Sequence, residues 1–240
     1  MRIFRVFCIG AAVAVSGIVV MCNKDSGTTP TTPPRNVLFS EGFEGTNLDS
    51  AGYTKLYNPP AYGWMSISTN AAHSGTSSLT SDSNNTGIRR WLDNPIRDSI
   101  AGLEFYLMAK ESGKTNFFAA ITTMGTSAGM LDNGFSALLG MGIDKSDSLW
   151  YSYQKYDNPQ ADSDLVHKTF AALEFNKWYK CTVEYDFTAQ KLTYYLNGSA
   201  IYTRSAPGIN VLDMFITMRD GLGDPGPKDY FIDDITIYKR

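Results

Sequence analysis

The sequence predicts an all-β protein in which two antiparallel sheets pack as a sandwich or close into a barrel. Short stretches alternate between apolar and polar residues or run apolar, and clusters of Gly, Asn, Asp and Pro separate them. Helical periodicity is almost absent along the 240 residues. Aromatic residues, which favour strands over helices, make up 13% of the chain.

Residues 1–21 are predicted to be a signal peptide rather than part of the fold. Arg2 and Arg5 precede an apolar run from Val6 to Cys22, which matches the charged and apolar regions of an export signal. A cysteine directly after such a run resembles the leader of bacterial lipoproteins. That resemblance implies cleavage before Cys22, whose thiol and new amino group then carry lipid.

The leader departs from the lipoprotein pattern at Met21, where that family usually has a small residue. An uncleaved anchor and an ordinary secretory signal therefore remain alternatives, and all three readings export the protein. We expect a lipid-anchored protein in the periplasm, in the outer membrane or at the cell surface. Residues 22–35 are rich in Thr and Pro and predict an extended tether, because such a composition cannot form a core.

The remaining residues, 36–240, are predicted to form one domain without disulfide bonds. Cys8 lies in the leader and Cys22 is the lipidation candidate, so Cys181 is the only cysteine left for the mature domain. In a strand, Cys181 shares a face with Val183 and Tyr185. This pattern indicates a small buried apolar residue rather than a nucleophile.

Twelve segments of this domain have the composition of strands. In chain order they are residues 36–43, 63–68, 77–82, 101–110, 115–125, 135–144, 148–156, 177–187, 191–198, 199–204, 213–220 and 229–238. The clearest local signal lies within residues 177–204. A polar turn at 186–191 separates two alternating stretches, and Asn197-Gly198 is the strongest two-residue hairpin turn. These residues predict three consecutive antiparallel strands.

Two groups of motifs resemble known families, and together they bracket nearly all of residues 37–240. Trp178, the "VEYD" strand and the hairpin "LTYYLNGSAIY" resemble the laminin-G-like and concanavalin A-like jelly-roll domains. The segments "LFSEGFEG", "GWMSIS", "AAHSGTSSL" and "FIDDITIY" are similar to jelly-roll carbohydrate-binding modules and bacterial adhesin domains. The resemblance implies the sandwich rather than the barrel, in the form of a two-sheet antiparallel jelly roll.

Asp233 occupies an unexpected position in the last predicted strand. Strict alternation places Asp233 on one face with Phe231, Ile235 and Ile237. An ionised carboxylate buried without a partner costs several kcal/mol or becomes protonated. Either a cation or a set of hydrogen bonds from backbone amides or an arginine would resolve this conflict.

The resembling modules imply that the partner is a structural calcium ion, which takes oxygen ligands from carboxylates and backbone carbonyls. Glu44 of "GFEG", a backbone carbonyl near Ser74 of "AHSG" and Asp233 stand where the ligands of that family stand. Glu41 is a further candidate, because it also falls on an otherwise apolar face. We therefore expect bound Ca²⁺ that couples the ends of the domain.

The sequence does not support a catalytic site. The E-x-D-x-E pattern of sandwich glucanases is absent, and the nearest carboxylates on one strand face are Glu184 and Asp186. His73 belongs to the "AHSG" segment that the resemblance assigns to structure, and His167 follows a polar loop. No catalytic residue is predicted, although a glycoside hydrolase or polysaccharide lyase of this fold remains an alternative.

Aromatic clusters favour carbohydrate binding, because apolar faces of sugars stack on flat rings. The segment "SLWYSYQKYDNPQ" is the densest cluster. Tyr151, Tyr153 and Lys155 share one face of it and are expected to point outward, because lysine is rarely buried. Trp150 lies on the other face, which then turns toward the core, and is a further candidate for sugar binding.

Two further segments supply exposed-ring candidates. "GIRRWLDN" places Trp91 beside two arginines, and "KLYNPPAYGW" places Tyr62 on a Pro-rich loop. In either segment, packing in the core is the alternative to binding.

The charge balance narrows the possible partners. The formal net charge is −3, and without Arg2 and Arg5 there are 19 Lys and Arg residues against 24 Asp and Glu residues. No basic stripe is present, so nucleic acid is not expected as a partner. We predict an exported, lipid-anchored protein that binds a polysaccharide or glycan and meets the membrane only through its lipid. An adhesion or structural protein of the envelope is the remaining alternative.

Overall fold

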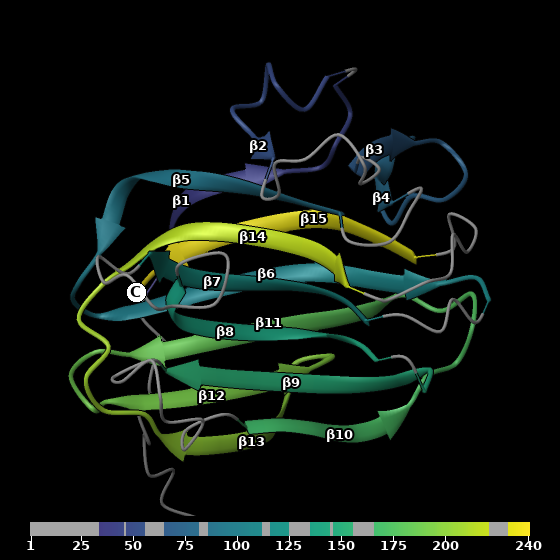
Figure 1. Ribbon diagram of the computed structural model, residues 1–240. Helices are drawn as coiled ribbons and strands as arrows, with labels where there is room; N and C mark the ends of the chain where they lie inside the picture. The colour runs from purple at the N-terminus through teal and green to yellow at the C-terminus, as the bar shows by residue number, and fades with distance from the viewer. Residues whose placement is uncertain are drawn as a thin grey trace, which may run out of the picture. The chain divides into compact units, whose positions relative to one another are not determined.

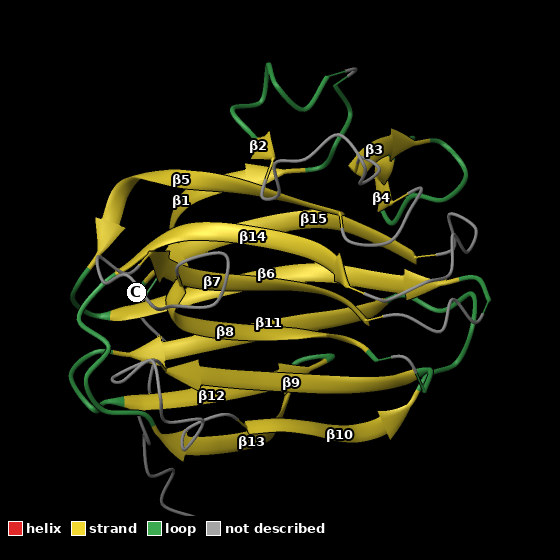
Figure 2. Ribbon diagram, in the orientation of Figure 1, coloured by secondary structure: helices red, strands yellow, loops and turns green. Residues whose placement is uncertain are grey.

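The structure is a computed structural model of the chain, and it confirms a two-sheet antiparallel β-sandwich (Figure 1). It describes residues 34–45, 47–55, 65–81, 86–111, 116–124, 135–144, 146–155, 166–220 and 230–240. Pro34–Arg240 forms one compact unit. In Figure 2 these residues form strands and loops only, and no helix among them is long and apolar enough to cross a membrane.

The first sheet has eight strands in the order β13-β12-β11-β6-β15-β4-β3, and β1 also pairs with β15. The strands are β1 (Asn36–Glu41), β3 (Met65–Ser68), β4 (Ser78–Ser81), β6 (Ile100–Ala109), β11 (Tyr179–Asp186), β12 (Lys191–Leu196), β13 (Ser199–Ser205) and β15 (Tyr230–Lys239). Strands β1 and β4 pair with different parts of β15, and β6 pairs along its other side. Strand β15 therefore brings the start of the domain and the β3–β4 hairpin together.

The second sheet has seven strands in the order β10-β9-β8-β7-β14-β5-β2. They are β2 (Thr54–Lys55), β5 (Thr86–Ile96), β7 (Asn116–Met124), β8 (Phe135–Ile143), β9 (Ser148–Lys155), β10 (Val166–Ala172) and β14 (Leu212–Asp220). Neighbouring strands are antiparallel throughout both sheets.

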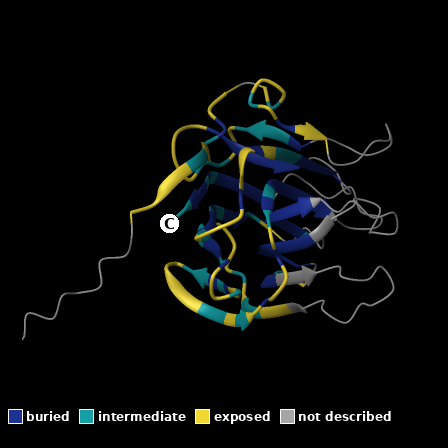
Figure 3. Ribbon diagram, turned by 90° about the vertical axis from the view of Figure 1, so that its left-hand side faces the viewer, coloured by how far each residue is buried: buried dark blue, intermediate teal, exposed yellow. Residues whose placement is uncertain are grey.

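The main core lies between the two sheets, where Figure 3 shows most strand segments as buried. In β7, Phe117, Ala119 and Ile121 belong to this core, whereas Phe118 and Ala120 belong to a second buried apolar cluster. Because side chains alternate along a strand, the second cluster lies on the face of the second sheet that is turned away from the first. Both faces of the second sheet are therefore apolar at its centre.

The predicted meander is present as β11, β12 and β13, which pair in sequence order. Asn197 and Gly198, with φ angles of 50° and 82°, form its tight turn. Positive φ at both central residues is what this hairpin type requires. The local prediction is confirmed because the turn residues determine the conformation without help from the rest of the fold.

A β-bulge in β15 changes the faces that strict alternation predicts. Asp233 pairs with Tyr106 and Thr236 pairs with Glu104, so β15 contains one more residue than β6 over this interval. Asp234 has a φ of 48°, which fits the bulged position. Ile235 therefore lies in the main core, on the opposite face of the strand from Asp233. The prediction that these two residues share a face was wrong.

Strands β2, β5 and β10 are absent from the predicted set. The sequence of β5, "TGIRRWLDNPI", contains two arginines, an aspartate, an asparagine and a proline, all poor signals for a strand. Its pairing with β14 is interrupted, because Trp91 pairs with Met214 and Ile96 pairs with Leu212. Four residues of β5, Leu92–Pro95, thus lie opposite the single residue Asp213 of β14. The regular strand pairing is interrupted at these four residues.

Candidate functional site

The predicted aromatic site on β9 is not an exposed surface. Tyr151 is only 2% exposed and belongs to the main core, where its ring stacks on those of Tyr194 and Tyr202 at 4.8 Å and 4.6 Å between centroids. The prediction that Tyr151 points outward was therefore wrong. Trp150 was expected to face the core between the sheets, but it belongs to the second buried cluster. Neither ring offers a face to a large ligand.

Other predicted residues lie at the limits of the described chain. For Tyr153 and Lys155 the structure describes only the backbone, which pairs with Leu139 and Ala137 of β8. Cys22 and Tyr62 fall outside the described residues. The predictions for these side chains stay predictions.

Trp91 is the predicted aromatic residue that the structure places at the surface. Its side chain lies in β5 and is 47% exposed. Asp93 and Asn94 in the interrupted part of the strand are also exposed. Together with Leu38 and Phe39 of β1, these residues line a small cavity of about 40 Å³ at the edge of the sandwich. An exposed indole, a carboxylate and an amide are thus gathered within one short segment.

Arg90 fixes the base of this surface. Its guanidinium carbon lies 4.5 Å from the centre of the Phe39 ring and 6.0 Å from that of Tyr53. These are cation–π distances, so the charge is held against aromatic rings rather than extended into solvent. Gly52, at φ 79°, leaves the space that the guanidinium occupies, since a Cβ there would collide with it. Arg90 therefore holds β5 against β1.

Asp233 is held by backbone amides of the loop between β3 and β4. Its Oδ2 accepts hydrogen bonds from the amides of His73 and Ser74 at 2.7 Å and 3.2 Å, and its Oδ1 accepts one from Asp234 at 2.8 Å. Burial raises the pKa of Asp233, and these hydrogen bonds, which act in the opposite direction, do not cancel the effect. In this structure Asp233 is thus accommodated by hydrogen bonds from backbone amides, one of the two arrangements expected from the sequence.

The same loop holds Glu44 from its other end. The carboxylate accepts hydrogen bonds from the amides of Thr76 and Ser77 and from the Thr76 hydroxyl. The Thr76 hydroxyl and these amides lower the pKa of Glu44. Gly75, at φ 62°, allows the close approach, because a Cβ at this position would collide with the Glu44 carboxylate. The loop thus joins the segment after β1 to β15.

The predicted calcium ligands are partly brought together. Glu44, Ser74 and Asp233 meet at this loop, whereas Glu41 instead accepts the amide of Phe43 at 2.7 Å. In the described part of the chain, no group of three or more His, Cys, Asp or Glu side chains is arranged to hold a metal ion. As arranged, the loop donates N–H groups to the carboxylates of Asp233 and Glu44. The calcium prediction itself stays a prediction.

His73 forms an aromatic cluster that the sequence does not reveal. Its ring stacks on Tyr106 of β6 at 3.4 Å between centroids and meets the edge of Trp178 at 5.7 Å. Its Nδ1 lies 2.6 Å from Oδ2 of Asp234. The three residues are far apart in the chain, so only the pairing of β6 with β15 and β11 could have indicated their contact. Because the rings pack on one another, they offer less free surface than Trp91 does.

The carboxylates considered as a catalytic pair have structural partners. Glu184 accepts hydrogen bonds from Tyr195, Tyr238 and Arg240, with its shortest Arg240 contact at 2.7 Å. Burial alone would raise the pKa of Glu184, but these bonds and the Arg240 charge lower it below its ordinary value. Asp186 accepts the amides of Thr188 and Ala189 in the following turn. Glu184 therefore lacks the raised pKa that a general acid needs, and both carboxylates are engaged by structural partners.

No protein-family model matches the sequence, and no curated protein matches it either. Similar solved structures exist. The T. cruzi calreticulin globular domain has a TM-score of 0.60 and 10% identity, over 85% of this chain and 88% of that one.

Two other solved structures are similar to a comparable degree. A chain from work on endo-acting O-glycanases of the human gut microbiota that initiate mucin breakdown has a TM-score of 0.59 and 10% identity, over 85% of this chain and 100% of that one. The CBM2 module of the Lactobacillus casei BL23 phage J-1 evolved Dit has a TM-score of 0.55 and 14% identity, over 85% and 96%. At these identities the likeness concerns the fold alone.

Proposed function

We propose that this protein binds carbohydrate and that Trp91 is the ring on which the sugar stacks. The observation that carries the proposal is the 47% exposure of Trp91 beside exposed Asp93 and Asn94. An indole face suits the apolar face of a sugar, while a carboxylate accepts from hydroxyl groups and an amide both donates and accepts. One neighbour in fold comes from work on O-glycanases and another is described as a CBM2 module, which supports this class of ligand.

The test is retention of residues 34–240, the compact unit, on a panel of soluble and insoluble polysaccharides. Trp91→Ala is expected to weaken binding at least about tenfold, because aromatic residues that become buried on binding supply much of the energy of most interfaces. Phe175→Ala is the matched control, since Phe175 is another exposed aromatic residue, at 43%, outside this surface. Equal loss in both variants, or retention unchanged in Trp91→Ala, would contradict the assignment.

The same incubations separate binding from degradation. Sugar ends released into solution are measured beside the protein retained. We expect retention without release, because Glu184 and Asp186 are occupied by structural partners. Release of new ends would favour the glycan-degrading alternative, and the absence of both signals would favour an adhesion or structural role.

We also propose that the protein is exported and anchored through lipid on Cys22. The support is the leader sequence, in which two arginines precede an apolar run that ends at this cysteine. Wild-type protein expressed in a bacterial host should partition into detergent and incorporate a labelled fatty acid. Cys22→Ser should abolish the labelling, whereas Cys8→Ser should not. Labelling that survives Cys22→Ser would contradict the anchor.

A further inference from the structure

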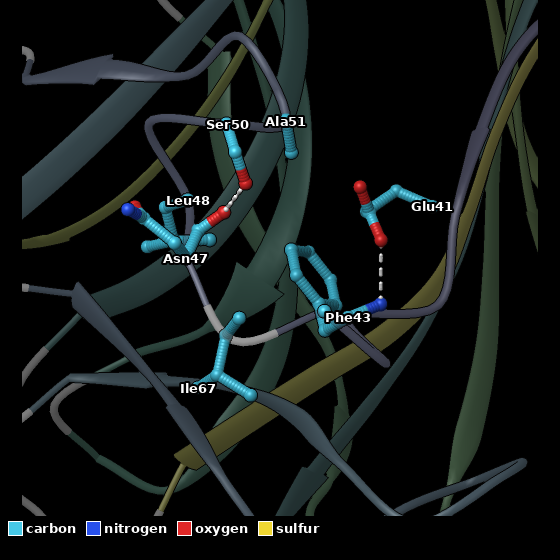
Figure 4. Close-up of a pocket in the computed structure, with 8 residues that line it drawn as sticks. Glu41, Phe43, Asn47, Leu48, Ser50, Ala51 and Ile67 are labelled. Atoms are coloured by element: carbon cyan, nitrogen blue, oxygen red, sulfur yellow. Dashed lines mark hydrogen bonds between the residues drawn. The ribbon is translucent and has the colours of Figure 1, made fainter.

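A second cavity lies at the end of β1 (Figure 4). It has a volume of about 260 Å³ and is bounded by the end of β1, the segment that follows it and Ile67 of β3. One water molecule occupies about 30 Å³, and pockets for drug-sized ligands typically have 300–1,000 Å³. The cavity therefore has room for one small ring rather than for a water or a long ligand.

The walls of the cavity combine apolar and polar groups. Phe43, Leu48, Ala51 and Ile67 supply the apolar surface, and Glu41, Asn47 and Ser50 are the polar residues. Two of the polar residues bond within their own turn, since Asn47 Oδ1 accepts the Asp49 amide and Ser50 Oγ donates to the Asn47 carbonyl. Glu41 is thus the polar residue of the cavity with most capacity for a ligand.

Glu41 is held with one oxygen engaged and the other available. Its Oε1 accepts the amide of Phe43 at 2.7 Å, as the dashed line in Figure 4 shows. Within the described residues, no donor contacts Oε2. Phe43 has a φ of 56°, a left-handed conformation that costs a residue with a Cβ roughly 1–2 kcal/mol. Strain of this kind is often retained at binding sites.

Tyr53 packs beside the cavity wall. Its ring stacks on that of Phe43, which lines the cavity, at 6.2 Å between centroids. Its side chain is only 2% exposed, and its hydroxyl has no hydrogen-bond partner among the described residues. An unsatisfied buried polar group costs about 1–3 kcal/mol. The fold therefore keeps a second unfavourable feature, besides the strain at Phe43, next to this cavity.

We propose that this cavity binds a single neutral hydroxylated ring, such as a monosaccharide or the terminal unit of a glycan. Glu41 accepts hydrogen bonds from its hydroxyl groups, and Leu48, Ala51 and Ile67 contact its CH groups. The ligand class rests on the proposed carbohydrate binding, but the site is separate from Trp91. An open polymer strand binds at Trp91, and an isolated ring or chain end binds here.

The test measures the binding of a panel of monosaccharides and reduced sugars to residues 34–240. Saturation-transfer NMR detects the binding, and calorimetry gives the affinity. Leu48→Trp fills the cavity, and Ser50→Phe blocks its rim from an exposed position. Glu41→Gln keeps an acceptor for the Phe43 amide while removing the charge. We expect loss of at least about tenfold in affinity for each blocking variant, equal to about 1.4 kcal/mol, with the melting temperature retained.

Comparison with Trp91→Ala separates this proposal from the function proposed above. If the two sites are distinct, Trp91→Ala loses polymer retention and keeps monosaccharide binding, and Ser50→Phe does the reverse. Binding of no sugar in the panel, or binding unaffected by both blocking variants, would overturn the cavity proposal. Monosaccharide binding lost only in Trp91→Ala would overturn it as well and would place that ligand at the indole.

Discussion

Glu184 illustrates how one buried carboxylate can stabilise this fold without taking part in chemistry. Its side chain is 8% exposed, and the Arg240 side chain that pairs with it is 17% exposed. Two tyrosine hydroxyls complete its shell of donors. The sequence placed Glu184 and Asp186 on one strand face correctly. It could not show that Glu184 is reached by Tyr238 of β15 and by Arg240, the residue after that strand.

We expect Glu184→Gln to lower the free energy of unfolding by about 1.5–3 kcal/mol at neutral pH, the range for hydrogen bonds to charged groups. The pKa of Glu184 is lowered in the folded state, so its stabilisation is present above the ordinary glutamate value and is lost as pH falls through the folded pKa. The difference between wild type and variant should therefore shrink in acid. Urea unfolding across pH measures it.

Glu174→Gln is the control for this residue. Glu174 pairs with Lys177 on the surface, where its side chain is 70% exposed. Exposed pairs contribute little, so the expected change is below about 1 kcal/mol. A loss in Glu184→Gln no larger than this, or one independent of pH, would contradict the role assigned to Glu184.

Residue-level predictions failed where both faces of a strand are buried. Placing Lys155 outside also placed Tyr151 outside, by alternation. In the structure Trp150 and Tyr151 are both buried, because the second sheet carries apolar clusters on each face. Alternation distinguishes two faces only when one of them meets water. Trp91 was identified as a candidate, yet its exposure depends on an interruption of β5 that the sequence does not reveal.

At the scale of one element, the bulge in β15 explains why Asp233 and Ile235 occupy different faces. The composition predicted a strand here correctly. The extra residue then places each later side chain on the face opposite to the one that plain alternation predicts. Asp234 is the bulged residue, with a φ of 48°. Asparagine and aspartate tolerate this conformation better than most residues, which is the one local signal available.

Deletion of Asp234 is expected to leave the domain folded. Ile235 would then follow Asp233 directly, so plain alternation would keep Ile235 and Ile237 in the main core and in register with β6. Deletion of Thr236 should instead turn Ile235 or Ile237 out of the core, with a loss of roughly 1.5–3 kcal/mol of burial. Circular dichroism and urea unfolding measure both variants. An unfolded Asp234 deletion beside a fully stable Thr236 deletion would contradict the bulge.

The loop between β3 and β4 yields a second prediction at this scale. Gly75→Ala forces a Cβ into a left-handed residue and against Glu44, whereas Gly198→Ala meets the same backbone conformation with nothing within 4 Å. Gly198→Ala should therefore cost about 1–2 kcal/mol from conformation alone. Gly75→Ala should cost at least about 1 kcal/mol more, because Glu44 must release its amide donors. Equal losses in urea unfolding would show that Glu44 moves aside freely.

For the whole molecule, composition and turn residues were sufficient to predict an all-β sandwich or barrel, and the family resemblance then favoured the sandwich. The meander of β11, β12 and β13 followed from local signals, and most strands fell where alternating segments were found. The order of strands within each sheet could not be predicted, because β15 pairs with β1, β4 and β6 across long stretches of chain. That pairing is what joins Glu44, the loop at 73–77 and Asp233 into one connection between the two ends of the domain.

The role of this connection in the stability of the whole domain is the basis of the last prediction. Amides at His73, Ser74, Thr76 and Ser77 satisfy Asp233 and Glu44 as the chain is arranged. We propose that calcium adds to these hydrogen bonds, so the melting temperature of residues 34–240 should be higher in calcium than in chelator, and Asp233→Asn should abolish the difference. A ligand at 100 times its dissociation constant stabilises the fold by about 2.7 kcal/mol, which is a measurable shift. Equal melting temperatures in calcium and chelator, lowered alike by Asp233→Asn, would show that the amides alone link the two ends of the domain.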